Sequence, residues 1–207
     1  MSDHTAPADP AITSVAVDAA GPRVSLSEEL AGYRAGDATE AAHVQRLREL
    51  LTTEDLWTRS SALHITGSAV VVHPPTGRVL LRWHERQQDW LQVGGHADPG
   101  EVDPLAVAMR EGVEETGLDD LRPWPDAGIV HVAVVPVEPS PKEPAHEHAD
   151  IRYALATDVP DLARPENPKA RLRWLPVAEA VALTRKPNTR ETLMRVGRLL
   201  DAHAPCS

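Results

Sequence analysis

One short acidic helix limits the fold and the chemistry of this chain more than any other feature. Helical periodicity extends from residue 103 to residue 116, and Gly117 follows at the position of a C-cap. On such a helix Glu111, Glu114 and Glu115 lie at i, i+3 and i+4 and share one face. Neighbouring carboxylates repel one another unless a cation neutralises them, and Mg²⁺ suits carboxylates combined with phosphate oxygens. Taken alone, three glutamates are also typical of a solvated acidic face.

The residues around this helix favour a binding site over a solvated surface. Gly94 and Gly95 open the preceding loop, where backbone without side chains can approach a metal or a phosphate closely. Residues 99–101, Pro-Gly-Glu, form a turn that directs a fourth carboxylate back towards the helix. Arg110 can pair with Glu114 or with Glu101. The opposite stripe of the helix is predicted to face a core: Leu105, Met109, Gly112, Val113 and Thr116.

In this spacing the residues resemble the signature of the Nudix hydrolase family. That signature is a Gly, five residues, a Glu, seven residues, and then Arg-Glu-apolar-x-Glu-Glu-x-Gly-apolar. Its fixed positions are occupied here by Gly95, Glu101, Arg110, Glu111, Glu114, Glu115, Gly117 and Leu118. Eight residues instead of seven separate Glu101 from Arg110, most simply because Val102 is inserted. Gly112 stands at an apolar position; it costs roughly 1 kcal/mol relative to Ala and predicts close packing of another element against the helix.

The resemblance implies a fold and an activity. The expected class is α/β with the Nudix fold, an α/β/α sandwich around a mixed β-sheet, plus an N-terminal helical extension. The expected activity is metal-dependent hydrolysis of a diphosphate linkage in a nucleoside diphosphate derivative or another small organic pyrophosphate. Mg²⁺ is the expected ion, with Mn²⁺ as its substitute.

The resemblance also implies roles for individual residues. Glu111, Glu115 and Glu114 are the expected metal ligands, with the Gly95 carbonyl as a further ligand. Arg110 is expected to orient the glutamates, and Glu101 to brace Arg110 or to hold an outer metal. One of these glutamates, or a carboxylate elsewhere in the chain, would take the proton from the attacking water.

A second polar constellation lies on a predicted strand over residues 146–156. Strand alternation places four polar side chains on one face: His146, His148, Asp150 and Arg152. We expect this row to contact substrate or, as a second choice, to bind an additional metal; a half-exposed polar face is the alternative. Arg82 and His84, on a strand predicted over residues 78–85, are further candidates to hold a substrate phosphate.

Periodicity divides the chain into three parts. Residues 1–23 are predicted to be a disordered tail, residues 24–60 a helical N-terminal extension, and residues 61–203 the Nudix domain. Capping-box spacing starts both helices of the extension, at Ser25 with Glu28 and at Asp37 with Glu40. The second helix carries an apolar stripe that would pack on the domain or on a second subunit. The extension could therefore serve as a lid over the domain or as the contact of a homodimer.

The rest of the expected elements follow from alternation, turns and caps. The further strands are predicted over residues 62–73, 90–93, 129–137 and 171–175. Two helices are predicted to end the chain, and Asn188 with Glu191 has capping-box spacing at the start of the second.

Charge and cysteine content weigh against other classes of protein. A formal net charge of -10 repels polyanions, so no nucleic-acid partner is expected. The chain shows neither a secretory signal nor a membrane span, so a cytoplasmic protein without a membrane partner is expected. The only cysteine, Cys206, is close to the C-terminus, which weighs against an isopentenyl diphosphate isomerase, a Nudix-fold enzyme with a cysteine in its core. A non-catalytic metabolite-binding module on the same scaffold is the alternative function.

Overall fold

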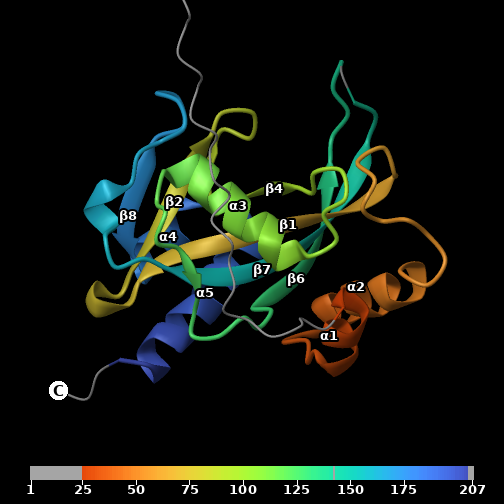
Figure 1. Cartoon of the computed structure of the whole chain (residues 1–207), viewed down its shortest axis with the longest axis horizontal. Helices are drawn as coiled ribbons and strands as arrows, with labels where there is room; N and C mark the ends of the chain where they lie inside the picture. Colours follow the sequence, from red (N-terminus) through yellow and green to blue (C-terminus); the bar gives the residue numbers. More distant parts are fainter. Residues whose placement is uncertain (1–24, 142, 205–207) are drawn as a thin grey trace, which may run out of the picture.

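A mixed β-sheet runs through the middle of the protein, and helices cover both of its faces (Figure 1). The computed structural model describes residues 25–141 and 143–204. Helix α3 (Pro104–Thr116) packs on one face, whereas α4 (Val177–Leu183) and α5 (Pro187–Ala202) pack on the other. The predicted α/β class, with helices on both faces of a mixed sheet, is confirmed. The predicted tail and Cys206 lie outside the described residues.

Two long strands form the centre of the sheet. β1 (Leu63–His73) and β7 (His146–Ala156) pair in parallel, with Leu63 opposite Glu147 and Val72 opposite Ala156. β1 is buried along nearly its whole length, as expected for a strand covered on both faces. All other pairings are antiparallel and involve β2 (Arg78–His84), β3 (Asp89–Leu91), β4 (Val93–His96), β5 (Arg122–Pro123), β6 (His131–Val137) and β8 (Leu172–Pro176).

Helix α3 begins and ends where its sequence predicts. The Asp103 side chain accepts a hydrogen bond from the backbone of Leu105, and Gly117 ends the helix in the left-handed conformation, with φ of 65°. Close packing at Gly112 is confirmed, because an added Cβ would lie 2.9 Å from Leu121 Cδ1. On the sheet side, an added Cβ at Gly67 of β1 would lie 2.2 Å from the Pro104 carbonyl oxygen.

The predicted apolar stripe of α3 is wrong at one position. Val113 is 38% exposed, whereas Val107 and Ala108 are fully buried. The buried side of the helix includes Gly112 and Glu115. The buried face of α3 is therefore shifted around the helix axis from the predicted stripe towards the glutamates. Val113, two residues before Glu115, consequently faces outwards.

The N-terminal extension forms α1 (Leu26–Gly32) and α2 (Ala38–Leu50), as predicted. Ser25 and Glu28 make both hydrogen bonds of the capping box. Val44 and Leu47 of α2 are buried in the same core as α3, so the domain itself covers these two residues of the stripe.

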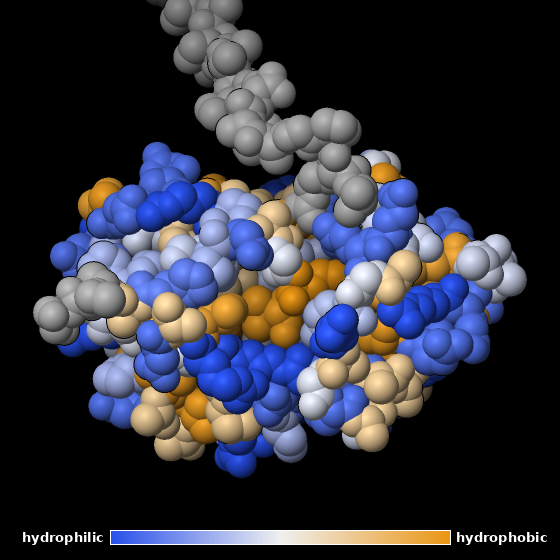
Figure 2. Space-filling model, turned by 90° about the horizontal axis from the view of Figure 1, so that it is seen from below, coloured by the Kyte–Doolittle hydropathy of each residue, from blue (hydrophilic) through white to orange (hydrophobic). Residues whose placement is uncertain are grey.

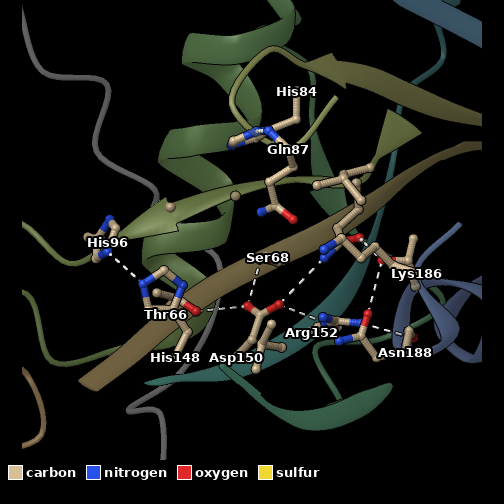
Figure 3. Close-up of a pocket in the computed structure, with 16 residues that line it drawn as sticks. Thr66, Ser68, His84, Gln87, His96, His148, Asp150, Arg152, Lys186 and Asn188 are labelled. Carbon is tan, nitrogen blue, oxygen red and sulfur yellow. Dashed lines mark hydrogen bonds and ion pairs between the residues drawn. The ribbon is translucent and has the colours of Figure 1, made fainter. Parts of the chain in front are cut away.

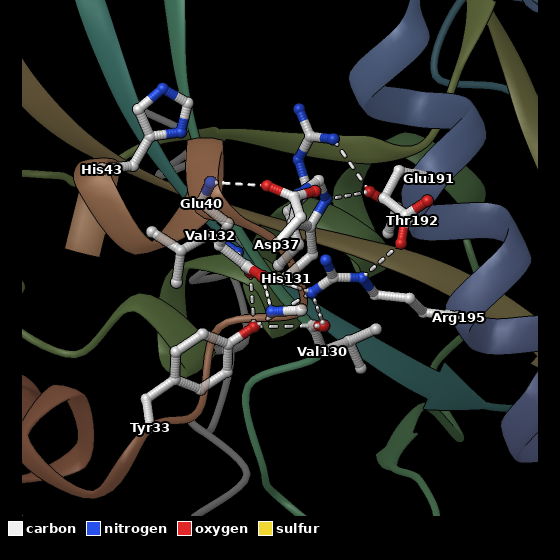
Figure 4. Close-up of polar contacts among 12 residues, drawn as sticks. Tyr33, Asp37, Glu40, His43, Val130, His131, Val132, Glu191, Thr192 and Arg195 are labelled. Atoms are coloured by element: carbon white, nitrogen blue, oxygen red, sulfur yellow. Dashed lines mark hydrogen bonds and ion pairs between the residues drawn. The ribbon is translucent and has the colours of Figure 1, made fainter.

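A buried ion pair joins this extension to the domain (Figure 4). Glu40 of α2 is 1% exposed, and one of its carboxylate oxygens lies 2.8 Å from Nη1 of Arg195 in α5. The Tyr33 hydroxyl and the Val132 amide donate to the same carboxylate, at 2.6 and 2.8 Å. Burial alone would raise the pKa of Glu40, but these hydrogen bonds outweigh it and lower the pKa. The reciprocal capping bond from the Glu40 side chain is therefore absent, because Glu40 faces the domain.

Three further boundaries differ from the sequence-based predictions. The strand predicted over residues 90–93 is two strands, β3 and β4, and the two-residue β5 was not predicted. Helix α5 begins at Pro187, and its N-cap, Lys186, makes no side-chain hydrogen bond. The capping box at Asn188 is wrong because Glu191 pairs instead with Arg195, one turn further along.

The surface is largely hydrophilic in the view from below, with an apolar band across a hollow in its middle (Figure 2). None of the helices within residues 25–141 and 143–204 is long and apolar enough to cross a membrane.

Candidate active site

Arg110 organises the acidic loop and helix. Its guanidinium donates to both carboxylate oxygens of Glu101, at 3.0 and 2.9 Å, in a bidentate pair. It also donates to Glu111 at 3.0 Å, to Glu114 at 3.2 Å and to the His96 carbonyl at 2.8 Å. The predicted pairing of Arg110 is confirmed with both partners. The additional residue in the loop thus does not separate Glu101 from Arg110, whose hydrogen bond lowers the pKa of Glu101.

Glu111 packs directly against the backbone of Gly95. A Cβ added at Gly95 would lie 2.3 Å from Oε1 of Glu111, so only glycine leaves room for the carboxylate in this position. Burial raises the pKa of Glu111, although its hydrogen bond from Arg110 acts in the opposite direction.

Glu115 is the most buried of the three helix glutamates, at 8% exposure. Its carboxylate accepts a hydrogen bond from the Gly94 amide at 3.1 Å and lies 3.3 Å from the Arg82 guanidinium. Burial raises the pKa of Glu115 to about 7, against the opposing effects of Arg82 and Gly94. Arg82 also pairs with Glu166, so this predicted phosphate ligand is held between two carboxylates.

The third glutamate, Glu114, points towards solvent. Its side chain is 54% exposed and pairs with Arg110. The three glutamates therefore share a helix without their oxygens converging on one point. Glu111 and Glu115 instead face two consecutive glycines of β4, Gly95 and Gly94.

The donors along Gly94 and Gly95 suit a hard divalent cation. They are the buried carboxylate of Glu115, the half-buried carboxylate of Glu111 and the adjacent backbone carbonyls, all of them oxygen ligands. Burial raises the pKa of both carboxyl groups, and a nearby cation would favour their ionised forms. The missing side chain of Gly95 lets the Glu111 carboxylate lie directly against the backbone at the same place. These residues consequently fit a Mg²⁺ or Mn²⁺ ion.

A polar cavity of about 230 Å³ lies beside β4 (Figure 3). Its walls come from β1, β2, β3, β4, β6, β7 and the start of α5, and they include predicted residues His84, His148, Asp150 and Arg152. Arg82 and His146 do not line it. It is also lined by four residues that were not predicted as site residues: Gln92, Lys186, Asn188 and Thr189.

Asp150 and Arg152 are bonded to each other inside this cavity. Arg152 Nε lies 2.7 Å from Asp150, whose carboxylate also accepts from Thr66 at 3.0 Å and Ser68 at 2.7 Å. Arg152 further donates to the Asn188 carbonyl and to Thr192. This pair thus connects β1, β7 and α5 and shapes the cavity, while its charges neutralise each other.

A second cavity, of about 750 Å³, lies on the side of the acidic loop. It is bordered by residues 95–102, by Glu111, and by Asp55 and residues 57–59 of the extension. Gly95 and His96 line both cavities. The two cavities therefore meet at the end of β4, next to the carboxylate of Glu111.

Four histidines gather at this end of the sheet: His64, His96, His146 and His148. Burial lowers the pKa of His64, that of His96 to about 4 and that of His148 to about 3. His64 and His96 were not predicted as site residues. The one available signal was the alternation of β1, which places His64 on the same face as Thr66 and Ser68.

Comparisons with known proteins agree with this architecture. A model of the NUDIX domain matches residues 63–196. The E. coli dihydroneopterin triphosphate pyrophosphohydrolase is 19% identical, with a TM-score of 0.50, covering 68% of this chain and 97% of that one. A binary complex of a C. elegans Ap4A hydrolase is 18% identical, with a TM-score of 0.53, covering 67% and 98% respectively. The search of curated proteins gave no match. At these identities the two structures show a shared fold.

Proposed function

The chain belongs to the NUDIX domain family of pyrophosphohydrolases, and from this premise we propose that it cleaves a diphosphate linkage in a nucleoside diphosphate derivative or another small organic pyrophosphate. The observation that carries the proposal is the apposition of Glu111 and Glu115 to Gly95 and Gly94 of β4. A buried and a half-buried carboxylate beside two glycines, whose backbone carries no side chain, form a site for a cation and for phosphate oxygens.

Glu111, Glu115 and the Gly95 carbonyl would hold the divalent ion, with Glu114 as an outer ligand. When bound, Mg²⁺ or Mn²⁺ neutralises phosphate charge and lowers the pKa of a bound water. Arg110 positions this group, since it holds Glu101, Glu111 and Glu114 at once. We assign removal of the proton from the attacking water to Glu111 or Glu115, because both carboxylates lie at the site, against Gly95 and Gly94.

The cavity beside β4 is our candidate binding site for the group attached to the diphosphate. His84, Gln92 and Lys186 line it. Within the described residues, no carboxylate oxygen lies within 4.0 Å of the Lys186 ammonium, unlike Arg82 and Arg152, which are already paired. Lys186 is therefore the cation that we assign to a substrate phosphate.

A screen of diphosphate compounds tests the proposal directly. The full chain would be incubated with nucleoside diphosphate derivatives and Mg²⁺ or Mn²⁺, and release of phosphate and nucleoside monophosphate would be measured. We expect hydrolysis of at least one compound and a loss on the order of 100-fold in Glu115→Gln, because the cation that would stabilise the reacting phosphate charge loses an anionic ligand.

Glu179→Gln is the matched control, because Glu179 is an exposed glutamate on α4. It should retain full activity. A folded protein without activity on any compound would instead favour the metabolite-binding alternative, and near-normal turnover in Glu115→Gln would remove that residue from the site.

A further inference from the structure

The four histidines come from three strands that meet beside Gly95. His64 lies on β1 directly opposite His148 of β7, and Thr66 of β1 lies opposite His96 of β4. His146 is two residues before His148 and projects from the same face of β7. In five of the pairs that these four rings form, the ring centroids are separated by 4.8 to 5.1 Å.

Backbone carbonyls set the tautomers of two of these rings. Nδ1 of His64 lies 3.0 Å from the Ser61 carbonyl, and Nδ1 of His146 lies 2.9 Å from the Pro144 carbonyl. A carbonyl only accepts hydrogen bonds, so both Nδ1 atoms carry the hydrogen and the neutral rings present a bare Nε2. Metal-binding histidines are oriented by this same arrangement.

The Nε2 atom of His64 is left without a protein partner. His64 is 2% exposed, and no hydrogen-bond partner for this nitrogen exists among the described residues. A buried acceptor with no donor costs free energy. The His64 ring packs against the other three rings, with centroid separations of 4.9 to 5.1 Å, and a cation held among them would use this lone pair.

The remaining Nε2 atoms are too close together for every contact to be a hydrogen bond. Nε2 of His148 lies 3.1 Å from Nε2 of His146 and 3.2 Å from Nε2 of His96. A single nitrogen–hydrogen bond on His148 can point straight at only one of these neighbours. Two nitrogens bound to one tetrahedral Zn²⁺, at about 2.0–2.1 Å each, are about 3.3–3.4 Å apart. The observed separations are close to that value.

We propose that His64, His146 and His148 form a second metal site, for a borderline divalent ion of the Zn²⁺ type, with His96 as its fourth ligand. The ligand atoms of the first three residues all lie within 4.8 Å of one another, and no other such group of His, Cys, Asp or Glu occurs in the described parts of the chain. Imidazole nitrogens suit Zn²⁺, Co²⁺ or Ni²⁺, whereas the carboxylates near Gly95 suit Mg²⁺. The bound ion would connect β1, β4 and β7 next to the acidic loop.

Cobalt substitution tests this site without reference to hydrolysis. The full chain, without a histidine tag and stripped with a chelator, would be titrated with Co²⁺ in excess Mg²⁺, which occupies oxygen sites. We expect visible absorption typical of four-coordinate nitrogen ligation, saturation at one ion per chain, and displacement by Zn²⁺. Zn²⁺ should also raise the melting temperature, since it binds the folded state.

Variants separate this site from the carboxylate site. His146→Ala should weaken Co²⁺ binding at least about tenfold, and because His146 is only half-buried, the variant should fold. His148→Ala should have the same effect, while His203→Ala, an exposed histidine, should bind as the unmodified chain does. Glu115→Gln should bind Co²⁺ normally even though hydrolysis is lost. Absence of the visible bands, or equal binding by His146→Ala, would overturn the proposal whether or not the protein hydrolyses diphosphates.

Discussion

Replacement of Gly95 by alanine tests the carboxylate site with the smallest available change. The added methyl carbon would lie 2.3 Å from Oε1 of Glu111, whereas ordinary contact begins near 3.4 Å. The Glu111 carboxylate must therefore move by about 1 Å, a displacement that can cost on the order of 100-fold in rate. That factor corresponds to about 2.7 kcal/mol of activation free energy. Because the obstructing atoms belong to the end of a flexible side chain, the fold should tolerate the substitution.

The assay is a comparison of kcat/KM and melting temperature for Gly95→Ala and Gly32→Ala. Gly32 has no atom within 4 Å of an added Cβ, so the same chemical change there should leave hydrolysis unaltered. An activity of Gly95→Ala within a few-fold of the unmodified chain would refute the reasoning. A large fall in its melting temperature would refute it equally, because the effect would then be global.

Three further substitutions have defined outcomes. Arg110→Lys should remain folded and lose about tenfold or more in kcat/KM, because an ammonium cannot reproduce the bidentate pair; unchanged kinetics would contradict the positioning role. Glu40→Gln should reduce the free energy of unfolding in urea by about 2 kcal/mol at pH 7, since Arg195 loses its buried counterion and keeps only the pairing with Glu191. The folded-state pKa of Glu40 is lowered from 4.5, so the ion pair stabilises fully above that pH and its contribution is lost as the pH falls through the folded-state value; a difference between the two proteins that grew on acidification would be the wrong sign. Gly67→Ala should destabilise by about 3 kcal/mol, because the obstructing atom is the backbone oxygen of Pro104, and a melting temperature near that of the unmodified chain would exclude the close approach.

Short-range features of the site could be predicted from the sequence. The caps of α3, the pairing of Arg110 and the space requirement at Gly112 all depend on residues a few positions apart or on one helix surface. The rotation of α3 about its axis could not be predicted from the sequence, because it depends on the sheet against which the helix packs. Val113 is apolar and opposite the glutamates in sequence terms, yet the burial of Glu115 turns it outwards.

Long-range juxtapositions were not accessible in this way. His64 and His148 are direct neighbours only because β1 and β7 pair in parallel across more than eighty positions of sequence. Likewise, the pairing of Arg82 with Glu166 joins residues 84 positions apart and could not be predicted from the sequence. The Asp150–Arg152 pair joins two residues of the predicted polar row, but their bond to each other was not predicted.

The Glu40–Arg195 pair has a consequence for where this protein can be shortened. The NUDIX match begins at residue 63, so a fragment that starts just before this residue would be a natural choice for expression of the domain alone. Such a fragment would leave the Arg195 guanidinium without the Glu40 carboxylate of α2, and it would uncover the core where Val44 and Leu47 had packed. The extension thus contributes residues to the core of the domain, and a shortened protein that keeps this core intact starts at α1.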